Sequence, residues 1–323
     1  MKFRTEIQID LSAHQIDYSS EILSLGSCFA LSIGERLCEA KFKTCVNPVG
    51  VLFNPLSISS TIERLSDCRG VDISELQKGR SGEWFHFDFH GSLSDVDPQV
   101  TLSNMNSAVS AGSKALAMCD TIIITLGTVW VYELIDSGDV VANCHKEPSS
   151  RFVRRAMSVD EVVTLLEAQV RRYPSKHFIF SVSPVRHLAD GLAENSLSKA
   201  TLRVALSKVV EREPNASYFA AYETLIDDLR DYRFYADDML HPSPQAIDYI
   251  WDKFCGSNIS VSERGLMSEV MAIVRAASHR PLNPASEAHL KFCQKQLEVI
   301  KKYPNIDFGK EYAYFMSQLQ NNL

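Results

Sequence analysis

Two short stretches of the chain hold residue types that could carry out nucleophilic chemistry. The first is Gly26-Ser27-Cys28, in which a hydroxyl and a thiol follow a glycine. The second is Asp238-Met239-Leu240-His241, in which a carboxylate precedes an imidazole by three residues. At that spacing the carboxylate can accept from one ring nitrogen and leave the other facing a nucleophile. Together the two stretches predict a nucleophile, a base and an orienting carboxylate, as in acyl transfer.

The first stretch lies where a predicted strand turns into a predicted helix. Residues 21–25 suit a short strand, and apolar residues recur at helical spacing over residues 29–40. Gly26 permits the tight turn between them, and free N–H groups and the positive end of the helix dipole meet there. We therefore expect the nucleophile, either Ser27 or Cys28, to lie beside its own source of oxyanion stabilisation.

Strands and helices alternate along most of the chain, which predicts a three-layer α/β/α fold with a mostly parallel sheet. The predicted strands of this sheet are residues 21–25, 41–46, 121–126, 178–182 and 217–221. Ligands in such sheets bind beyond the carboxyl ends of the strands. Four segments can therefore converge on one rim of the sheet: residues 26–28, Gly127-Thr128, Ser183-Pro184 and His241.

Three other stretches give local predictions. Residues 84–91 alternate aromatic and polar side chains, which predicts a strand with His86, Asp88 and His90 on one face. A solvated or hydrogen-bonded face is favoured there over a metal site. Residues 186–195 are predicted as a polar loop before a helix over residues 196–210. Ser158 and Glu161 have the spacing of a capping box at the start of another helix. Ser243 suits the N-cap and Pro244 the first turn of a helix over residues 244–254.

Composition limits the function classes. The 323 residues carry 33 Lys and Arg against 40 Asp and Glu, a net charge of -7, which argues against general nucleic-acid binding. The sequence contains no run of about 18 apolar residues that would predict a membrane span, and its N-terminus has no apolar signal core. We therefore expect a cytoplasmic protein. The eight cysteines show no CxxC spacing, which favours reduced thiols without a structural zinc site or any other metal.

The chain divides into two predicted regions. Residues 1–260 form the α/β domain, and residues 261–323 form a helical C-terminal extension interrupted near Pro281 and Pro284. Its apolar periodicity needs a covering surface. We expect the extension to pack on the α/β domain or on a second subunit, which would give a homo-oligomer through the C-terminal helices.

Several motifs together resemble the GSCFA family over about residues 1–255. They are Leu25-Gly26-Ser27-Cys28-Phe29-Ala30, Asn47-Pro48-Val49-Gly50, Leu126-Gly127-Thr128 with Trp130, Asn143-Cys144-His145-Lys146, Ser183-Pro184-Val185-Arg186-His187 and Asp238-Met239-Leu240-His241-Pro242. The family is similar to the SGNH (GDSL-like) hydrolases, which are three-layer α/β esterases and acyltransferases. The resemblance implies that residues 1–260 are an SGNH-like domain whose three-layer α/β/α fold is SGNH- or flavodoxin-like.

The resemblance departs from the GDSL pattern at two places. An ungapped comparison puts Cys28 in the nucleophile position, whereas a gap of one residue puts Ser27 there. We favour Cys28, because a thiol at a helix N-terminus beside His241 should have a lowered pKa. The Gly-x-Asn-Asp block, whose Asn donates to the oxyanion, is replaced here by residues 127–130. Thr128, Asn47 or Asn143 could supply the missing donor.

The implied function is an acyl-ester hydrolase or acyltransferase of SGNH type, acting on a small molecule or glycan. It requires no cofactor, although a transferase would use an acyl donor such as acyl-CoA. The alternative is a non-catalytic ligand-binding or scaffold protein on the same fold. The candidate catalytic residues are Cys28, Ser27, His241 and Asp238. The candidate oxyanion and substrate-binding residues are Gly26, Asn47, Gly50, Gly127, Thr128, Asn143, His145, Lys146 and Arg186, the last three of which could bind a phosphate or carboxylate.

Overall fold

A five-stranded parallel sheet forms the centre of the computed structural model, which describes residues 4–189 and 191–320. Its order is β10-β9-β5-β1-β2, the order of flavodoxin-like doubly wound sheets. The strands are β1 (Glu21–Gly26), β2 (Lys43–Val46), β5 (Thr121–Leu126), β9 (His177–Val182) and β10 (Ala216–Tyr218). All neighbouring pairs run parallel, which confirms the predicted sheet.

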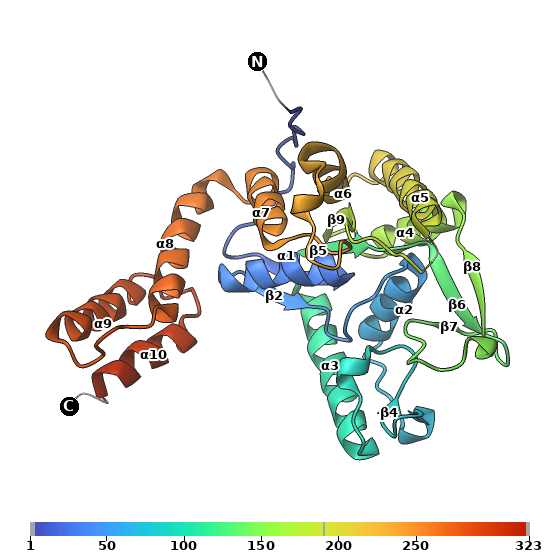
Figure 1. Cartoon of the computed structure of the whole chain (residues 1–323), viewed down its shortest axis with the longest axis horizontal. Coiled ribbons are helices and arrows are strands. Elements are labelled where there is room, and N and C mark those ends of the chain that lie inside the picture. Colours follow the sequence, from blue (N-terminus) through green and yellow to red (C-terminus); the bar gives the residue numbers. More distant parts are fainter. Residues whose placement is uncertain (1–3, 190, 321–323) are drawn as a thin grey trace.

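Helices cover both faces of this sheet (Figure 1). One face carries α2 (Pro55–Ser66), α3 (Pro98–Met118), α4 (Val159–Arg172) and α5 (Gly191–Arg212). The other carries α1 (Cys28–Glu39), α6 (Ala221–Glu223) with the π-helical turn Thr224–Leu229, and α7 (Pro244–Asn258). Within β5, Ile122 and Ile124 pack against the first set and Ile123 against the second, since side chains alternate along a strand. The three-layer prediction is confirmed.

Side-chain caps begin the helices at residues that the sequence predicts. Ser158 accepts the N–H of Glu161 at 3.2 Å, and the Glu161 carboxylate accepts the N–H of Ser158 at 2.7 Å. Ser243 accepts the N–H of Ala246 at 3.3 Å at the start of α7, and Pro244 occupies the first turn of that helix. The caps hold the start of α7 directly after the loop that contains His241.

The predicted strand over residues 84–91 is wrong beyond its first two residues. Only β4 (Trp84–Phe85) pairs, with β3 (Gln77–Lys78). After it the backbone turns, because the N–H of Asp88 donates to Nδ1 of His86 at 3.0 Å and His90 caps the 3-10 helix Gly91–Leu93. Local side-chain hydrogen bonds thus override the alternating pattern.

A small antiparallel sheet lies beside the main domain. It consists of β7 (Val140–Val141), β6 (Trp130–Leu134) and β8 (Phe152–Ala156), and the sequence analysis contains no strand at β8. The helix α5 begins at Gly191, so the predicted polar loop over residues 186–195 is too long. As a result, β8 and the first turns of α5 bring side chains to the edge of the main sheet that the sequence did not predict there.

The C-terminal helices form a bundle with its own core. The helices are α8 (Val261–Ser278), α9 (Glu287–Ile300) and α10 (Gly309–Gln320), and Val270, Cys293 and Phe315 are buried between them. The bundle lies at the opposite end of the molecule from β8 (Figure 1). It contacts the α/β domain through an ion pair of 2.7 Å between Lys41 and Glu311, which are both largely buried.

Candidate functional site

The turn between β1 and α1 is held by close backbone contacts. Gly26 has a φ of +137°, and a Cβ at this position would overlap the carbonyl oxygen of Thr125 in the neighbouring strand. Its N–H donates to the side-chain oxygen of Asn47 at 2.8 Å, and the N–H of Ser27 donates to Thr125 at 3.1 Å. Asn47 therefore orients the turn that leads into Cys28.

Ser27 and Cys28 have different environments. Ser27 is 1% exposed, and its hydroxyl accepts the N–H of Phe29 at 3.3 Å as the N-cap of α1. Cys28 is half-buried and lines a cavity at the carboxyl ends of the strands. The geometry therefore assigns the helix cap to Ser27 and places the Cys28 thiol where a ligand could meet it.

The acidity of Cys28 differs from the prediction. Burial raises the pKa of its thiol, whereas the sequence argument predicts that the helix N-terminus lowers it. A partly apolar environment disfavours the thiolate, so the resting side chain is a thiol at neutral pH. A nucleophilic role for Cys28 therefore needs a base that takes its proton.

His241 and Asp238 form the hydrogen-bonded pair that their spacing predicts. Nδ1 of His241 lies 2.6 Å from the Asp238 carboxylate. The second carboxylate oxygen accepts the backbone N–H groups of Leu240 and His241 at 2.9 and 3.0 Å. Hydrogen bonds from the backbone and ring of His241, and then from Leu240, lower the pKa of Asp238 to about 2. The carboxylate is thus ionised at neutral pH, and the Nε2 atom of His241 is left to exchange a proton.

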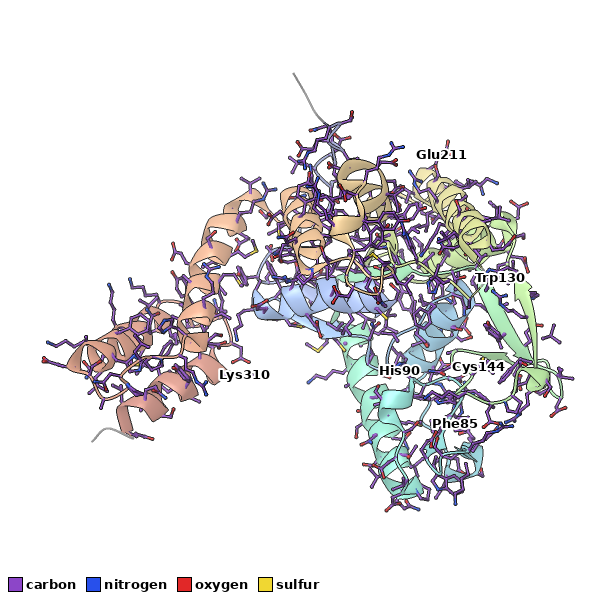
Figure 2. The ribbon with its side chains drawn as sticks, viewed as in Figure 1. Phe85, His90, Trp130, Cys144, Glu211 and Lys310 are labelled. Atoms are coloured by element: carbon purple, nitrogen blue, oxygen red, sulfur yellow. The ribbon has the colours of Figure 1, made fainter. Side chains whose placement is uncertain are left out.

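Cys28 and His241 line the same cavity. Its volume is about 390 Å³, within the range of small-molecule sites. The remaining lining residues are Phe53, Asn54, Thr128, Trp130, Tyr132, Val141, Ala142, Arg154, Val185, Arg186, His187 and Ala189. They come from the loops after β2, β5 and β9, from the small sheet, where Figure 2 labels Trp130, and from the residue after β7. Of the predicted rim, Cys28, Thr128 and His241 line this cavity, whereas Gly26, Ser27, Gly127, Ser183 and Pro184 do not.

The loop before α2 crosses the end of the central strand. The carbonyl oxygen of Phe53 accepts the N–H groups of Gly127 and Thr128, at 2.7 and 2.9 Å. These two amides are therefore engaged, although the sequence analysis treats both residues as oxyanion candidates. Asn54 follows Phe53, is 5% exposed, and accepts the N–H of Ser57 at 2.8 Å through Oδ1. That bond fixes the amide, so its Nδ2 is the group able to donate into the cavity.

One face of α5 supports the loops that line the cavity. Lys199 is 1% exposed, and its Nζ donates to the carbonyl oxygens of Gly127 and Ser183, both at 2.7 Å. Ser198 accepts the N–H of Val129 at 3.0 Å, and Asn195 accepts the N–H of His187, also at 3.0 Å. Burial lowers the pKa of Lys199 to about 7. These side chains fix the ends of β5 and β9 relative to each other.

Seven of the nine predicted oxyanion and binding residues do not line the cavity: Gly26, Asn47, Gly50, Gly127, Asn143, His145 and Lys146. Oδ1 of Asn143 accepts the N–H of His145, whose ring Nε2 lies 3.1 and 3.0 Å from the carbonyl oxygens of His86 and Phe89. The ring also stacks on Phe85. Figure 2 shows the neighbouring Cys144 on the side of Phe85, in the part of the molecule around β4 and away from Trp130. Residues 143–145 therefore stabilise the turns around β4.

Sequence reasoning missed several lining residues. Asn54 is not among the residues predicted for the site. The guanidinium of Arg154 lies 3.8 Å from the ring centre of Trp130, and β8, which carries Arg154, was not predicted. His187 packs edge-on against Phe53, with 5.8 Å between ring centres. The signal for Asn54 was its Asn-Pro step, which is typical of a capped helix start.

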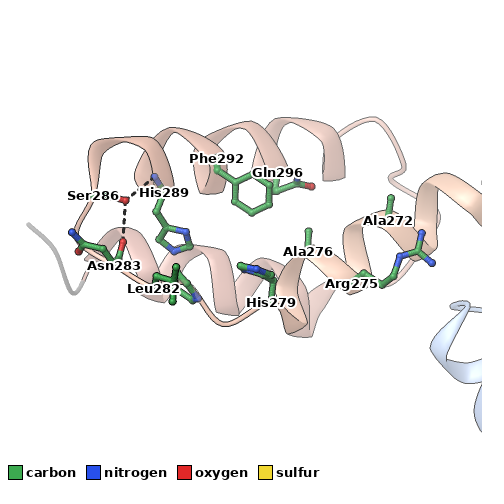
Figure 3. Close-up of a pocket in the computed structure, with 11 residues that line it drawn as sticks. Ala272, Arg275, Ala276, His279, Leu282, Asn283, Ser286, His289, Phe292 and Gln296 are labelled. Atoms are coloured by element: carbon green, nitrogen blue, oxygen red, sulfur yellow. Dashed lines mark hydrogen bonds between the residues drawn. The ribbon is translucent and has the colours of Figure 1, made fainter.

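A larger cavity of about 750 Å³ lies in the C-terminal bundle (Figure 3). His279, His289 and Phe292 face it from α9 and from the end of α8. Cys293, whose sulfur lies 3.5 Å from Nε2 of His289, is fully buried among apolar side chains. The Ser286 hydroxyl that lines this cavity caps α9, and the lining residues include no carboxylate to pair with a histidine, so the smaller cavity at the sheet edge is the candidate site.

The described residues form neither a metal-binding cluster nor a membrane-spanning helix. Residues 4–189 and 191–320 contain no group of three or more His, Cys, Asp or Glu side chains arranged to hold a metal ion. None of the helices in these ranges is both long enough and apolar enough to span a bilayer.

The fold and site define a three-layer α/β protein with a cysteine and an Asp–His pair at the carboxyl edge of its sheet. Residues 21–254 match the GSCFA family, and residues 270–321 match the C-terminal domain of GSCFA domain proteins. The chain therefore belongs to the GSCFA family. No curated protein and no solved structure matches it.

Proposed function

We propose that this protein transfers acyl groups through Cys28, as an acyl-ester hydrolase or an acyltransferase of SGNH type acting on a small molecule or glycan. The observation that carries the proposal is that Cys28 and His241, whose ring bonds to Asp238, line one cavity of ligand size. The buried hydroxyl of Ser27 caps a helix, which favours Cys28 as the attacking group.

The proposed reaction begins with a proton transfer. Nε2 of His241 takes the proton of the Cys28 thiol as the sulfur attacks the carbonyl carbon of an acyl ester. The tetrahedral intermediate collapses, and the leaving alcohol takes the proton from His241, which gives a thioester on Cys28. Water or an acceptor hydroxyl then attacks the thioester with His241 as base, and the thiol is regenerated. Asp238 orients the imidazole and stabilises its protonated form.

Asn54 supplies the oxyanion donor that the GDSL pattern places elsewhere. Its Nδ2 and the backbone N–H of Cys28 are the proposed donors to the negative oxygen. The N–H of Cys28 lies in the first turn of α1, where no carbonyl of the same helix can accept it. The amides of Gly127 and Thr128 already bond to Phe53, which leaves the side chain of Asn54 as the better candidate.

The base is tested first. Wild type and His241→Ala are assayed against a panel of acyl esters, and against acyl-CoA with glycan acceptors. We expect His241→Ala to lower kcat/KM by about 10² to 10⁴, the range for loss of a general base. Equal rates for both proteins on every substrate that is turned over would remove the proposal. Binding without turnover in wild type would favour the ligand-binding alternative.

The oxyanion donor is tested with Asn54→Asp. This variant keeps an oxygen that can cap α2 but replaces the donating Nδ2 by a carboxylate oxygen. We expect kcat to fall by about 100- to 1000-fold while the melting temperature stays close to that of wild type. Unchanged kcat in a well-folded Asn54→Asp protein would show that Asn54 is not a donor.

A further inference from the structure

Arg186 lines the cavity of Cys28, although the proposed acyl transfer gives it no role, and it also lines a second cavity with Tyr232, Tyr235 and Asp231. The residue follows β9, and its side chain is half-buried. The guanidinium carbon lies 4.0 Å from the ring centre of Tyr235 and 5.1 Å from that of Tyr232. Stacking on aromatic rings restricts the orientation of the guanidinium plane. The group is therefore positioned before any ligand binds.

No carboxylate in the described part of the chain lies within ion-pair distance of Arg186, and Asp231, which lines the second cavity with it, pairs with Arg233 at 3.3 Å. Other partly buried arginines do have such partners. Arg64 pairs with Asp88 at 2.7 Å, and Arg203 pairs with Glu223 at 2.8 Å. A half-buried guanidinium held by tyrosine rings, with no carboxylate partner, favours an anion from solution.

The backbone links Arg186 to the proposed base. Its N–H donates to the carbonyl oxygen of Leu240 at 3.2 Å, directly before His241. The loop after β9 and the loop of the Asp–His pair are thus joined at this point. An anion bound at Arg186 would have a fixed position relative to His241, as an anchored substrate requires.

We propose that Arg186 binds a carboxylate or phosphate group of the acyl compound that reaches Cys28. A guanidinium can form paired hydrogen bonds to two oxygens of either group. The identity of the reacting carbonyl rests on the proposed acyl transfer, whereas the anion site rests on Arg186 and its surroundings. The two claims can therefore fail separately.

The test compares an anionic and a neutral alkylating reagent of similar size. Full-length protein is treated with iodoacetate or iodoacetamide, and the rates at Cys28 and at the exposed Cys68 are measured by peptide mass spectrometry. We expect the iodoacetate-to-iodoacetamide rate ratio to be about tenfold higher at Cys28 than at Cys68, because the nearby positive charge attracts the anion. Arg186→Gln should reduce the Cys28 ratio to the Cys68 value, and Arg186→Lys should keep part of the preference.

Arg80→Gln provides the control, since it removes the same charge at an exposed position outside the cavity. It should leave both ratios unchanged. Equal ratios at the two cysteines of wild type, or an undiminished Cys28 ratio in Arg186→Gln, would overturn the proposal. Neither measurement needs turnover, so an inactive enzyme with the expected ratios would count against acyl transfer and not against the anion site.

A binding measurement decides the case in which Cys28 resists both reagents. Inorganic phosphate or acetate should raise the melting temperature of wild type above that in chloride at equal ionic strength, since a ligand of the folded state stabilises it. The anion that gives the larger rise in melting temperature shows whether phosphate or carboxylate is the preferred group. The rise should disappear in Arg186→Gln and persist in Arg80→Gln. No rise with either anion, or an equal rise in Arg186→Gln, would contradict an anion site at Arg186.

Discussion

Replacement of Cys28 by alanine is expected to lower the rate of acyl transfer by at least about 10⁴-fold. The substitution removes the sulfur that forms the thioester, and loss of a nucleophile leaves only binding and oxyanion stabilisation. Steady-state turnover of the substrate identified in the ester panel measures the effect. The neighbouring hydroxyl of Ser27 is a poor substitute, because it is buried in the cap of α1.

Ser27→Ala is the informative counterpart of this variant. It should keep most of the activity and lose about 1 kcal/mol of stability, the usual cost of removing a serine N-cap. Cys68→Ala, at an exposed cysteine away from the cavity, should behave as wild type. The assignment fails if Cys28→Ala remains active and Ser27→Ala does not.

Gly26→Ala is expected to destabilise the fold by at least about 4 kcal/mol, an unusually large effect for a single substitution. A Cβ at residue 26 would overlap the carbonyl oxygen of Thr125, and the φ of +137° is strained for any residue with a side chain. The obstacle is backbone of the central strand β5, which cannot move as a side chain can. Chemical denaturation with a two-state fit measures the loss.

Gly265→Ala is the matched control for this backbone argument. Gly265 is exposed within α8, and an added Cβ would meet no atom within 4 Å. Alanine favours a helix by about 1 kcal/mol over glycine, so this variant should be slightly more stable than wild type. A Gly26→Ala protein as stable as wild type would show that the turn before Cys28 tolerates a side chain.

The layers of the fold could be predicted because local signals agree with one another. Apolar strands such as residues 121–126 are long and rich in β-branched residues, and caps such as Ser158 and Ser243 mark helix starts. Asp238 and His241 could be paired from sequence because three residues of loop bring their side chains together. These features depend on neighbours in the chain and therefore need no knowledge of distant contacts.

The residues that line and support the cavity could not be predicted in the same way. Asn54 lines the cavity, and Lys199 supports its loops, because the loop before α2 and α5 pack against the end of β5, contacts between segments far apart in the chain. His145 has the residue type of a ligand-binding group, but its ring bonds to the carbonyls of a distant turn. Residue type alone does not distinguish these cases, since burial and hydrogen-bond partners are set by tertiary packing.

The acidity of Cys28 illustrates the same limit. A helix N-terminus lowers the pKa of a thiol, whereas burial raises it, and the sequence displays only the first of these influences. In the folded protein burial prevails, so His241 gains importance as the base. The proposed mechanism thus resembles that of a serine enzyme, in which the proton leaves the nucleophile during attack.

The most direct test of the central claim is to identify the residue that carries the acyl group. Full-length protein is mixed with the ester that it turns over, quenched in acid within one turnover, digested and analysed by mass spectrometry. We predict an acyl thioester on the peptide that contains Cys28, located on the sulfur by fragmentation, removable by hydroxylamine and absent from Cys28→Ala. An acyl group on Ser27, or steady turnover by Cys28→Ala at the wild-type rate, would contradict the account.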